Sequence, residues 1–235
     1  MITEKPMPAR PLESSPESAE RKAVISSFPA FLKTQYKIKM EEIEDEKELH
    51  AAHEDITEYQ FLITHHVLSE SDNASSLRDM WRKLREIARQ KEEEQNFSIF
   101  QRGIVTQVAI HQVFKELGFN PRFSRPKHDA FKKIDLWSDA KHAVQVKGSA
   151  CEKFGIFETD EVGLTPVEIS EDGKTKKLFD NEFRLFKTKL KSFGNDVKGY
   201  FIVIPSDKID FTTGKPSKEL IDLIRQKISP QKKAA

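Results

Sequence analysis

The chain has 235 residues and carries 39 Lys and Arg against 38 Asp and Glu, which gives a formal net charge of +1. This length fits one domain of ordinary size with a smaller helical region beside it. A single cysteine excludes a disulfide within the chain and a cysteine-rich zinc site. Because no apolar run approaches the roughly 20 residues that span a bilayer, and the N-terminus lacks the apolar core of a secretory signal, we expect a soluble, cytoplasmic protein with no membrane partner.

The N-terminal part of the sequence changes character at about residue 21. Residues 1–21 are rich in Pro, Ser and Glu and show no apolar period, so we expect a disordered tail. Apolar residues at helical spacing then predict a helical region over 22–96. Its expected helices cover 22–40 with an interruption at Pro29, 55–68 (a strand is the less favoured alternative), and 75–94.

A strongly acidic segment lies within this helical region. Between residues 41 and 58, nine acidic side chains stand against Lys47 alone. Such a surface repels a phosphate backbone, and two interpretations stay open: a solvated helix face, or a lid that competes with nucleic acid for a basic patch. Four nearby histidines have no cysteine or H-E-x-x-H pattern beside them and are interpreted as parts of solvated faces, not as metal ligands: His50, His53, His65 and His66.

From residue 97 onward the pattern becomes mixed. A helix over 101–117 is expected to end at Gly118, and a helix over 180–193 is expected to begin at the N-cap Asp180. The expected strands are 119–123, 131–137, 142–147, 155–159, 166–170 and the apolar run 199–205, and a last helix over 218–228 follows Ser217. This order predicts an α/β domain over 97–235, with a central mixed β-sheet flanked by helices.

Three polar residues of the predicted hairpin are expected to share one side of the sheet. Side chains alternate along a strand, so Gln145 and Lys147 point to one face while Val146 points to the other. With a turn near Asp139, Asp135 would lie opposite Val144 or Gln145. Carboxylate, amide and backbone carbonyl oxygens can hold a hard divalent cation and its waters. The plainer alternative is an exposed strand aspartate and a solvent-facing lysine.

The stretch KKIDLWSDAKHAVQVKG, residues 132–148, resembles the PD-(D/E)xK nuclease superfamily, which includes restriction enzymes and Holliday-junction resolvases. Gln145, Val146 and Lys147 stand where the family has (D/E)-x-K, and the resemblance extends over roughly residues 101–205. It implies a restriction-endonuclease-like fold and a hydrolase, an endonuclease that cuts phosphodiester bonds in DNA with Mg²⁺ or Mn²⁺. A homodimer is compatible with it.

The resemblance also implies a role for each matching residue. Asp135 and Gln145 would bind the metal together with the carbonyl of Val146, and Lys147 would position the attacking water or neutralise charge on the phosphate. Gln107 would occupy the place of the glutamate that the family often carries on its first helix. Because the two glutamines add no negative charge, the alternative is a catalytically lapsed nuclease fold that binds nucleic acid or a protein.

Basic residues are concentrated in the nuclease-like half. Residues 121–153 hold eight Lys and Arg against four acids, and residues 174–208 hold nine against four. The expected phosphate contacts are Arg122, Arg125, Lys127, Lys187, Lys189 and Lys191. His111 could contact a phosphate or simply pack in its helix. A further hypothesis places the function in the helical region, where Trp81 could be an interface anchor as easily as a core residue.

Overall fold

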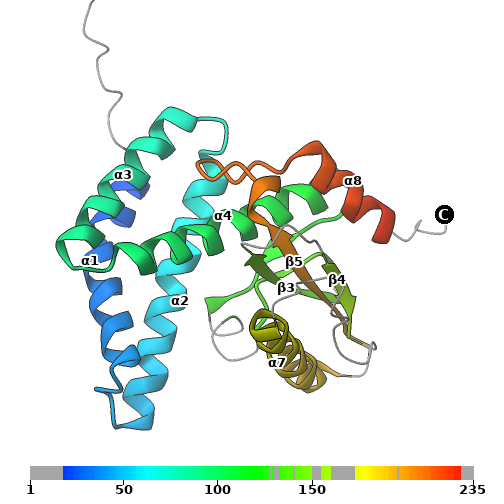
Figure 1. The fold of residues 1–235 in the computed structure, drawn as a ribbon, viewed down its shortest axis with the longest axis horizontal. Coiled ribbons are helices and arrows are strands. Elements are labelled where there is room, and N and C mark those ends of the chain that lie inside the picture. Colours follow the sequence, from blue (N-terminus) through cyan, green and yellow to red (C-terminus); the bar gives the residue numbers. More distant parts are fainter. Residues whose placement is uncertain are drawn as a thin grey trace, which may run out of the picture.

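The computed structural model describes residues 18–126, 129, 133–139, 141–149, 155–159, 173–194 and 196–228. Most of the predicted tail, the predicted strand over 166–170 and the candidate Lys127 lie outside these residues. Within them, the chain forms a helical part and an adjoining part that contains a β-sheet (Figure 1). No helix in the described ranges is both long enough and apolar enough to cross a bilayer.

Three helices make up the first part: α1 (Ala19–Lys39), α2 (Glu46–Ser69) and α3 (Ala74–Gln90). The predicted interruption at Pro29 is wrong, because α1 runs through this residue without a break. Pro29 is exposed while Phe28, Phe31 and Leu32 are buried. Burial of these side chains outweighs the roughly 3 kcal/mol that a proline costs inside a helix.

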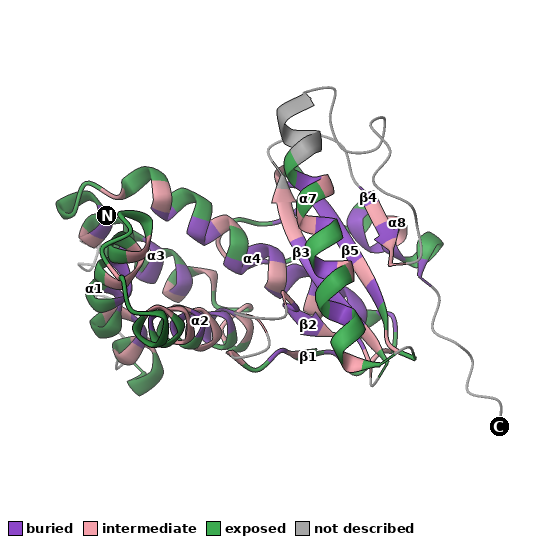
Figure 2. Ribbon diagram, turned by 90° about the horizontal axis from the view of Figure 1, so that it is seen from below, coloured by how far each residue is buried: buried purple, intermediate pink, exposed green. Residues whose placement is uncertain are grey.

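The long helix α4 (Glu94–Glu116) connects the two parts (Figures 1 and 2). It begins seven residues before the predicted start at 101, and the expected boundary between 96 and 97 therefore falls inside it. Near its start, Phe97 and Phe100 stack among aromatic residues of α1 and α2, with Phe100 4.9 Å from Phe31 between ring centroids. Farther along, Val105, Val108 and Ile110 join the same continuous core beneath the sheet.

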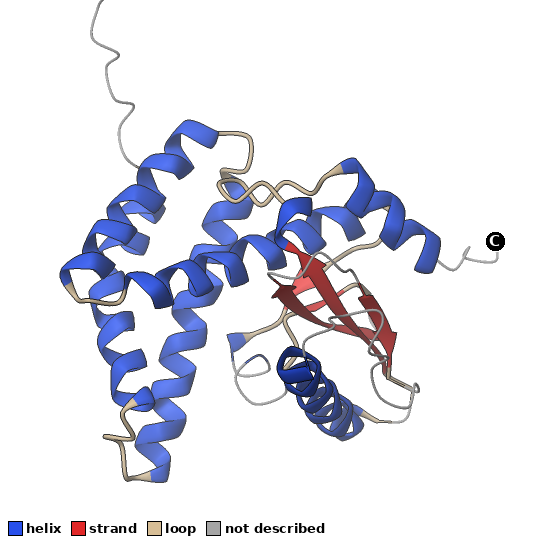
Figure 3. Ribbon diagram, in the orientation of Figure 1, coloured by secondary structure: helices blue, strands red, loops and turns tan. Residues whose placement is uncertain are grey.

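The sheet is mixed and has the strand order β1-β2-β3-β5-β4 (Figure 3). Its strands are β1 (Arg122–Phe123), β2 (Leu136–Trp137), β3 (His142–Ser149), β4 (Gly155–Glu158) and β5 (Lys198–Pro205). The pairs β1–β2, β2–β3 and β4–β5 are antiparallel, whereas β3 and β5 are parallel. The structure thus confirms an α/β fold with a central mixed sheet and flanking helices.

Helices cover both faces of this sheet. On one face, α4 and α8 (Lys218–Lys227) pack with Val144, Val146 and Ile202. On the other, α7 (Gly173–Leu190) packs Phe183 and Phe186 against Phe201. The predicted N-cap Asp180 is wrong: it lies within α7, where its Oδ2 is 2.8 Å from Arg184 Nη2, because the helix starts seven residues earlier. Gly194, with φ of 105°, follows the short turn after α7.

Candidate functional site

The carboxylate of Asp135 is the centre of a buried polar cluster. Its side chain is 6% exposed, and it accepts hydrogen bonds from Gln107 Nε2 at 3.1 Å and from Gln145 Nε2 at 2.9 Å. The backbone N–H of Val146 donates to the same carboxylate at 2.5 Å. Asp135, Gln145 and Gln107, which were predicted to share a site, are therefore in direct contact.

The hairpin register explains how Asp135 reaches β3. Leu136 pairs with Val144, as one of the predicted alternatives requires, and the backbone N–H of Asp135 donates to Val144 O at 2.9 Å. Of the predicted strand over 131–137, residues 131 and 132 lie outside the described residues. Among the others, β2 contains only Leu136 and Trp137, and Lys133 has φ of 57°. Where β2 no longer pairs with β3, the N–H of Val146 donates its hydrogen bond to the Asp135 side chain instead of to a strand backbone. The N–H and C=O of a residue in an extended strand point to the same edge, so the Val146 carbonyl faces this edge too.

A close approach between β3 and α4 brings Gln107 within reach. A Cβ atom placed on Gly148 would lie 2.8 Å from Thr106 Oγ1 and 2.9 Å from the Cγ of Arg102. Only glycine therefore fits at this position without a shift of the helix. Gly148 belongs to a strand that packs against a helix; it is not part of a turn.

Asp129 is a site residue that the sequence analysis missed. Its carboxyl is hydrogen-bonded to that of Asp135. Burial, and then the neighbouring Asp135, raise the pKa of Asp129 well above its usual range. Burial also raises the pKa of Asp135, against the opposing effects of the Lys147 charge and the Val146 N–H. Two adjacent buried carboxyls cannot both ionise at low cost, so burial and proximity favour the neutral form of one of them.

A small cavity of about 10 Å³ lies beside this carboxyl pair. Its walls include Thr57, Phe61 and Thr64 of α2 together with Ser124, Asp129 and Asp135. This volume corresponds to about one water molecule. Two buried oxygens, Ser124 Oγ and Gln145 Oε1, have no hydrogen-bond partner among the described residues. Unpartnered buried oxygens beside two buried carboxyls form an environment that a cation or a water would stabilise.

The donor set fits a hard divalent cation. Asp129 and Asp135 supply carboxylate oxygens, and Gln145, Ser124 and the Val146 carbonyl supply neutral ones, which suits Mg²⁺ or Mn²⁺. No group of three or more His, Cys, Asp or Glu that could hold a metal occurs within the described ranges. Any cation here would therefore depend on amide, hydroxyl and backbone oxygens in addition to two carboxylates.

Lys147 lies on the side of the sheet that α7 covers. Its Nζ is 3.0 Å from Glu182 Oε2, and both side chains are partly exposed, at 28% and 31%. The positive charge of Lys147 lowers the pKa of both Asp129 and Asp135, although the effect of burial is larger. The lysine is thus electrostatically coupled to the carboxyl pair and still accessible to solvent.

The predicted phosphate contacts lie at the surface where they are described. Arg122 and Arg125 are exposed beside β1, Lys187 is half-buried on α7, and Lys189 and Lys191 are exposed at its end. Arg122 pairs opposite Trp137, whose ring centroid is 5.5 Å from that of Phe193 in the turn after α7. Trp137 therefore links the strand that carries Arg122 with the turn next to Lys191.

Three other residues have packing roles. His111 stacks on Phe123 at 4.7 Å between ring centroids, and burial lowers its pKa. Trp81 is 5% exposed and donates from Nε1 to Thr212 O at 2.8 Å, so of its two interpretations the structure favours the core residue over the interface anchor. The interpretation of His66 as part of a solvated face is wrong as well, since this residue is 1% exposed.

Comparison of the chain with models of protein families, with curated proteins and with solved structures found no match.

Proposed function

We propose that this chain is a metal-dependent nuclease of the restriction-endonuclease-like type that hydrolyses phosphodiester bonds in DNA. The observation that carries the proposal is the convergence of Gln107 and Gln145 on Asp135, with Lys147 on the same strand as Gln145. These are the four positions to which the PD-(D/E)xK resemblance gives catalytic roles. The order of β1, β2 and β3, followed by α7 and the parallel strand β5, also supports it.

The side chains of the site suit hydrolysis of a phosphodiester. A divalent cation held by Asp129, Asp135 and Gln145 would supply Lewis-acid polarisation of the scissile phosphate. Lys147, held by Glu182, places a positive charge where negative charge develops on the phosphate oxygens. Gln107 fixes the orientation of the Asp135 carboxylate. Arg122, Arg125 and Lys189 are exposed and can contact the DNA backbone on either side of the cut.

Access to the carboxyl pair is controlled by α2. Thr57, Phe61 and Thr64 cover the cavity, so a phosphodiester can reach Asp135 only after α2 or the segment around Phe123 shifts. The acidic segment over residues 41–58 had two interpretations. The position of α2 over the cavity supports a lid. The exposed acids of the segment, including Glu48, Asp55 and Glu58, support a solvated helix face.

A cleavage assay tests the proposal. Supercoiled plasmid and single-stranded DNA are incubated with the full chain and Mg²⁺ or Mn²⁺, and Asp135→Asn and Lys147→Met are compared with the surface control Lys218→Gln. We expect metal-dependent cutting that falls by roughly 100-fold or more in the two site variants and is unchanged in the control. Cutting that survives both site changes would exclude the assigned site.

One observation favours a second candidate function, a lapsed nuclease fold that binds nucleic acid or protein. Both oxygens of Asp135 already accept N–H donors, from Gln107, Gln145 and Val146, which compensates its charge without a metal. This alternative predicts salt-sensitive binding, no metal-dependent cutting and no calorimetric Mg²⁺ signal. Metal-dependent cutting distinguishes the two functions. Gln145→Glu tests the alignment itself: a rise in Mg²⁺ affinity would support an ancestral metal site, and no change would argue against it.

A further inference from the structure

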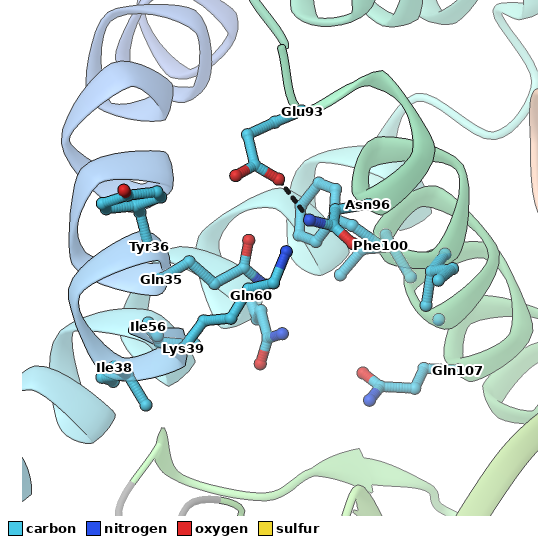
Figure 4. Close-up of a pocket in the computed structure, with 13 residues that line it drawn as sticks. Gln35, Tyr36, Ile38, Lys39, Ile56, Gln60, Glu93, Asn96, Phe100 and Gln107 are labelled. Carbon is cyan, nitrogen blue, oxygen red and sulfur yellow. Dashed lines mark hydrogen bonds between the residues drawn. The ribbon is translucent and has the colours of Figure 1, made fainter. Parts of the chain in front are cut away.

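A cleft of about 410 Å³ opens between α1, α2 and α4 (Figure 4). Its volume falls within the roughly 300–1,000 Å³ range of small-molecule sites. At one end it is lined by Gln107, the residue that also donates to Asp135 and borders the small cavity beside it. The cleft is therefore connected to the candidate catalytic cluster through a single side chain.

The lining of the cleft combines amides with apolar walls. Side-chain amides come from three helices, with Gln35 on α1, Gln60 on α2, and Asn96 and Gln107 on α4. Figure 4 shows Gln35, Gln60 and Gln107 extending into the space between these helices. Each amide offers both a donor and an acceptor, the pattern that reads the polar edge of a nucleobase. Ile56, Ile104 and Phe100 supply the apolar part of the lining.

An exposed aromatic residue and several lysines continue the cleft outward. Tyr36 is 45% exposed, and it borders both this cleft and a second hollow of about 490 Å³. Lys39 lines the first hollow, and Lys33 and Lys91 line the second. The one acid that the two hollows share, Glu93, already accepts a hydrogen bond from Asn96. Aromatic platforms alternating with cations are the usual means of binding a single strand without sequence readout.

Gly103 gives an independent indication of an occupant. It lies in the interior of α4, borders the cleft and is exposed, and a Cβ atom placed on it would meet nothing within 4 Å. Glycine weakens a helix relative to alanine, and no neighbour in the described structure requires it here. A ligand that lies close against the α4 backbone would require it.

The acidic segment does not oppose this arrangement. Ile56 and Gln60 face the cleft from α2, one turn apart. The exposed Asp55 and Glu58 project from the other side of the same helix. The basic residues that line the two hollows are Lys33, Lys39 and Lys91, and Glu93 is the acid among the lining residues.

We propose that this cleft receives an unpaired base of a single-stranded nucleic acid, whose backbone follows Lys39, Lys33 and Lys91 while a neighbouring base stacks on Tyr36. The proposal rests on the proposed nuclease function and specifies its substrate class: nucleic acid that contains a single-stranded segment beside the phosphodiester to be cut. Gln107 would connect base binding in the cleft with the orientation of Asp135.

Binding in the absence of metal tests this proposal. Fluorescence anisotropy with a labelled single-stranded oligonucleotide and with its duplex, in buffer that contains EDTA, should show tighter binding of the single strand. Tyr36→Ala should weaken it roughly 5- to 100-fold, the range for loss of one base–aromatic stack, and Gly103→Leu should weaken it similarly by filling the cleft. Lys39→Gln should lower the salt slope by about 0.7, whereas the control Lys218→Gln should not. Equal affinity in wild type, Tyr36→Ala and Gly103→Leu would overturn the proposal.

Two further measurements keep the outcomes separable. Gly103→Leu should raise the melting temperature by roughly 2–4 °C; if it does not fold, Tyr36→Ala decides alone, because Tyr36 is exposed. Single-strand binding that depends on Tyr36 without any metal-dependent cutting supports the cleft and refutes the nuclease. Cutting that requires Asp135 but is indifferent to both cleft variants refutes the cleft and supports the nuclease.

Discussion

Gln107 of α4 donates a 3.1 Å hydrogen bond to Asp135, from which it is separated by 28 residues in the chain. This contact joins the helix that runs through the whole molecule to the strand edge that carries the candidate catalytic residues. A change at either residue should therefore alter both the stability of the fold and the chemistry of the site.

Replacement of Gln107 by glutamate tests whether the cluster is arranged for a cation. In the absence of metal, Gln107→Glu places a third carboxyl against Asp135 and Asp129. We expect a loss of about 1–3 kcal/mol in the free energy of unfolding, which Mg²⁺ should restore. Urea denaturation with and without Mg²⁺ measures this, and the exposed Gln226→Glu on α8 serves as a control. A destabilisation that Mg²⁺ leaves unchanged would count against a metal site.

The contact between β3 and α4 can be tested by a pair of glycine substitutions with opposite expected signs. Gly148→Ala should destabilise the protein by about 1–3 kcal/mol, since its Cβ would approach Thr106 Oγ1 to 2.8 Å. Gly103 lies on α4, and a Cβ atom placed on it meets no neighbour within 4 Å, so Gly103→Ala should stabilise the protein by up to about 1 kcal/mol. Thermal unfolding measures both. Similar effects of the two substitutions would show that the packing around Gly148 is looser than the structure indicates.

Removal of residues 1–96 should prevent folding of the remaining chain. The deletion leaves Phe97 and Phe100 of α4 without Phe28, Phe31 and Tyr59, with which they form one aromatic cluster. We expect an insoluble product, or one without a cooperative transition by circular dichroism and calorimetry. A truncated chain that unfolds cooperatively would instead establish the helical region as a separate domain.

The histidines contribute a part of the stability that should fall as the pH is lowered from about 7.5 to about 5.5. Burial lowers the pKa of His53, His65 and His111, and the charge of Lys133 also contributes at His53. Since the fold disfavours the charged imidazoles, the unfolded chain binds more protons below their ordinary value of 6.5. The histidine contribution is therefore complete above this pH and is lost as the pH falls toward the lowered values, whereas the raised pKa of Asp129 contributes with the opposite sign.

His111 allows this pH effect to be assigned. His111→Phe keeps a ring to stack on Phe123 and removes the titratable group, so the variant should lose less stability between the two pH values than the wild type. Urea midpoints at both pH values measure the difference. An identical loss in the variant would exclude His111 as a source.

Local patterns in the sequence were sufficient for several elements. The apolar spacing of Leu77, Trp81 and Leu84 predicted α3, and the run over 199–205 predicted β5. The alternation of Gln145 and Lys147 followed in the same way, and the hairpin was narrowed to two registers, of which the structure selects the one that pairs Leu136 with Val144. Such features depend on the 3.6- and 2-residue periods of side chains along one segment, which neighbouring residues specify.

The site itself required contacts between segments that are distant in the chain. Pro29 remains helical and Asp180 is not an N-cap because packing of α1 and α7 outweighs local preference. Asp129 joins Asp135 from a helical position between β1 and β2, and α2 covers both carboxyls. The sequence identifies the polar residues near Asp135, but which of them share a buried volume depends on how α2, α4 and β3 pack. Burial in turn determines which of their side chains carry a charge.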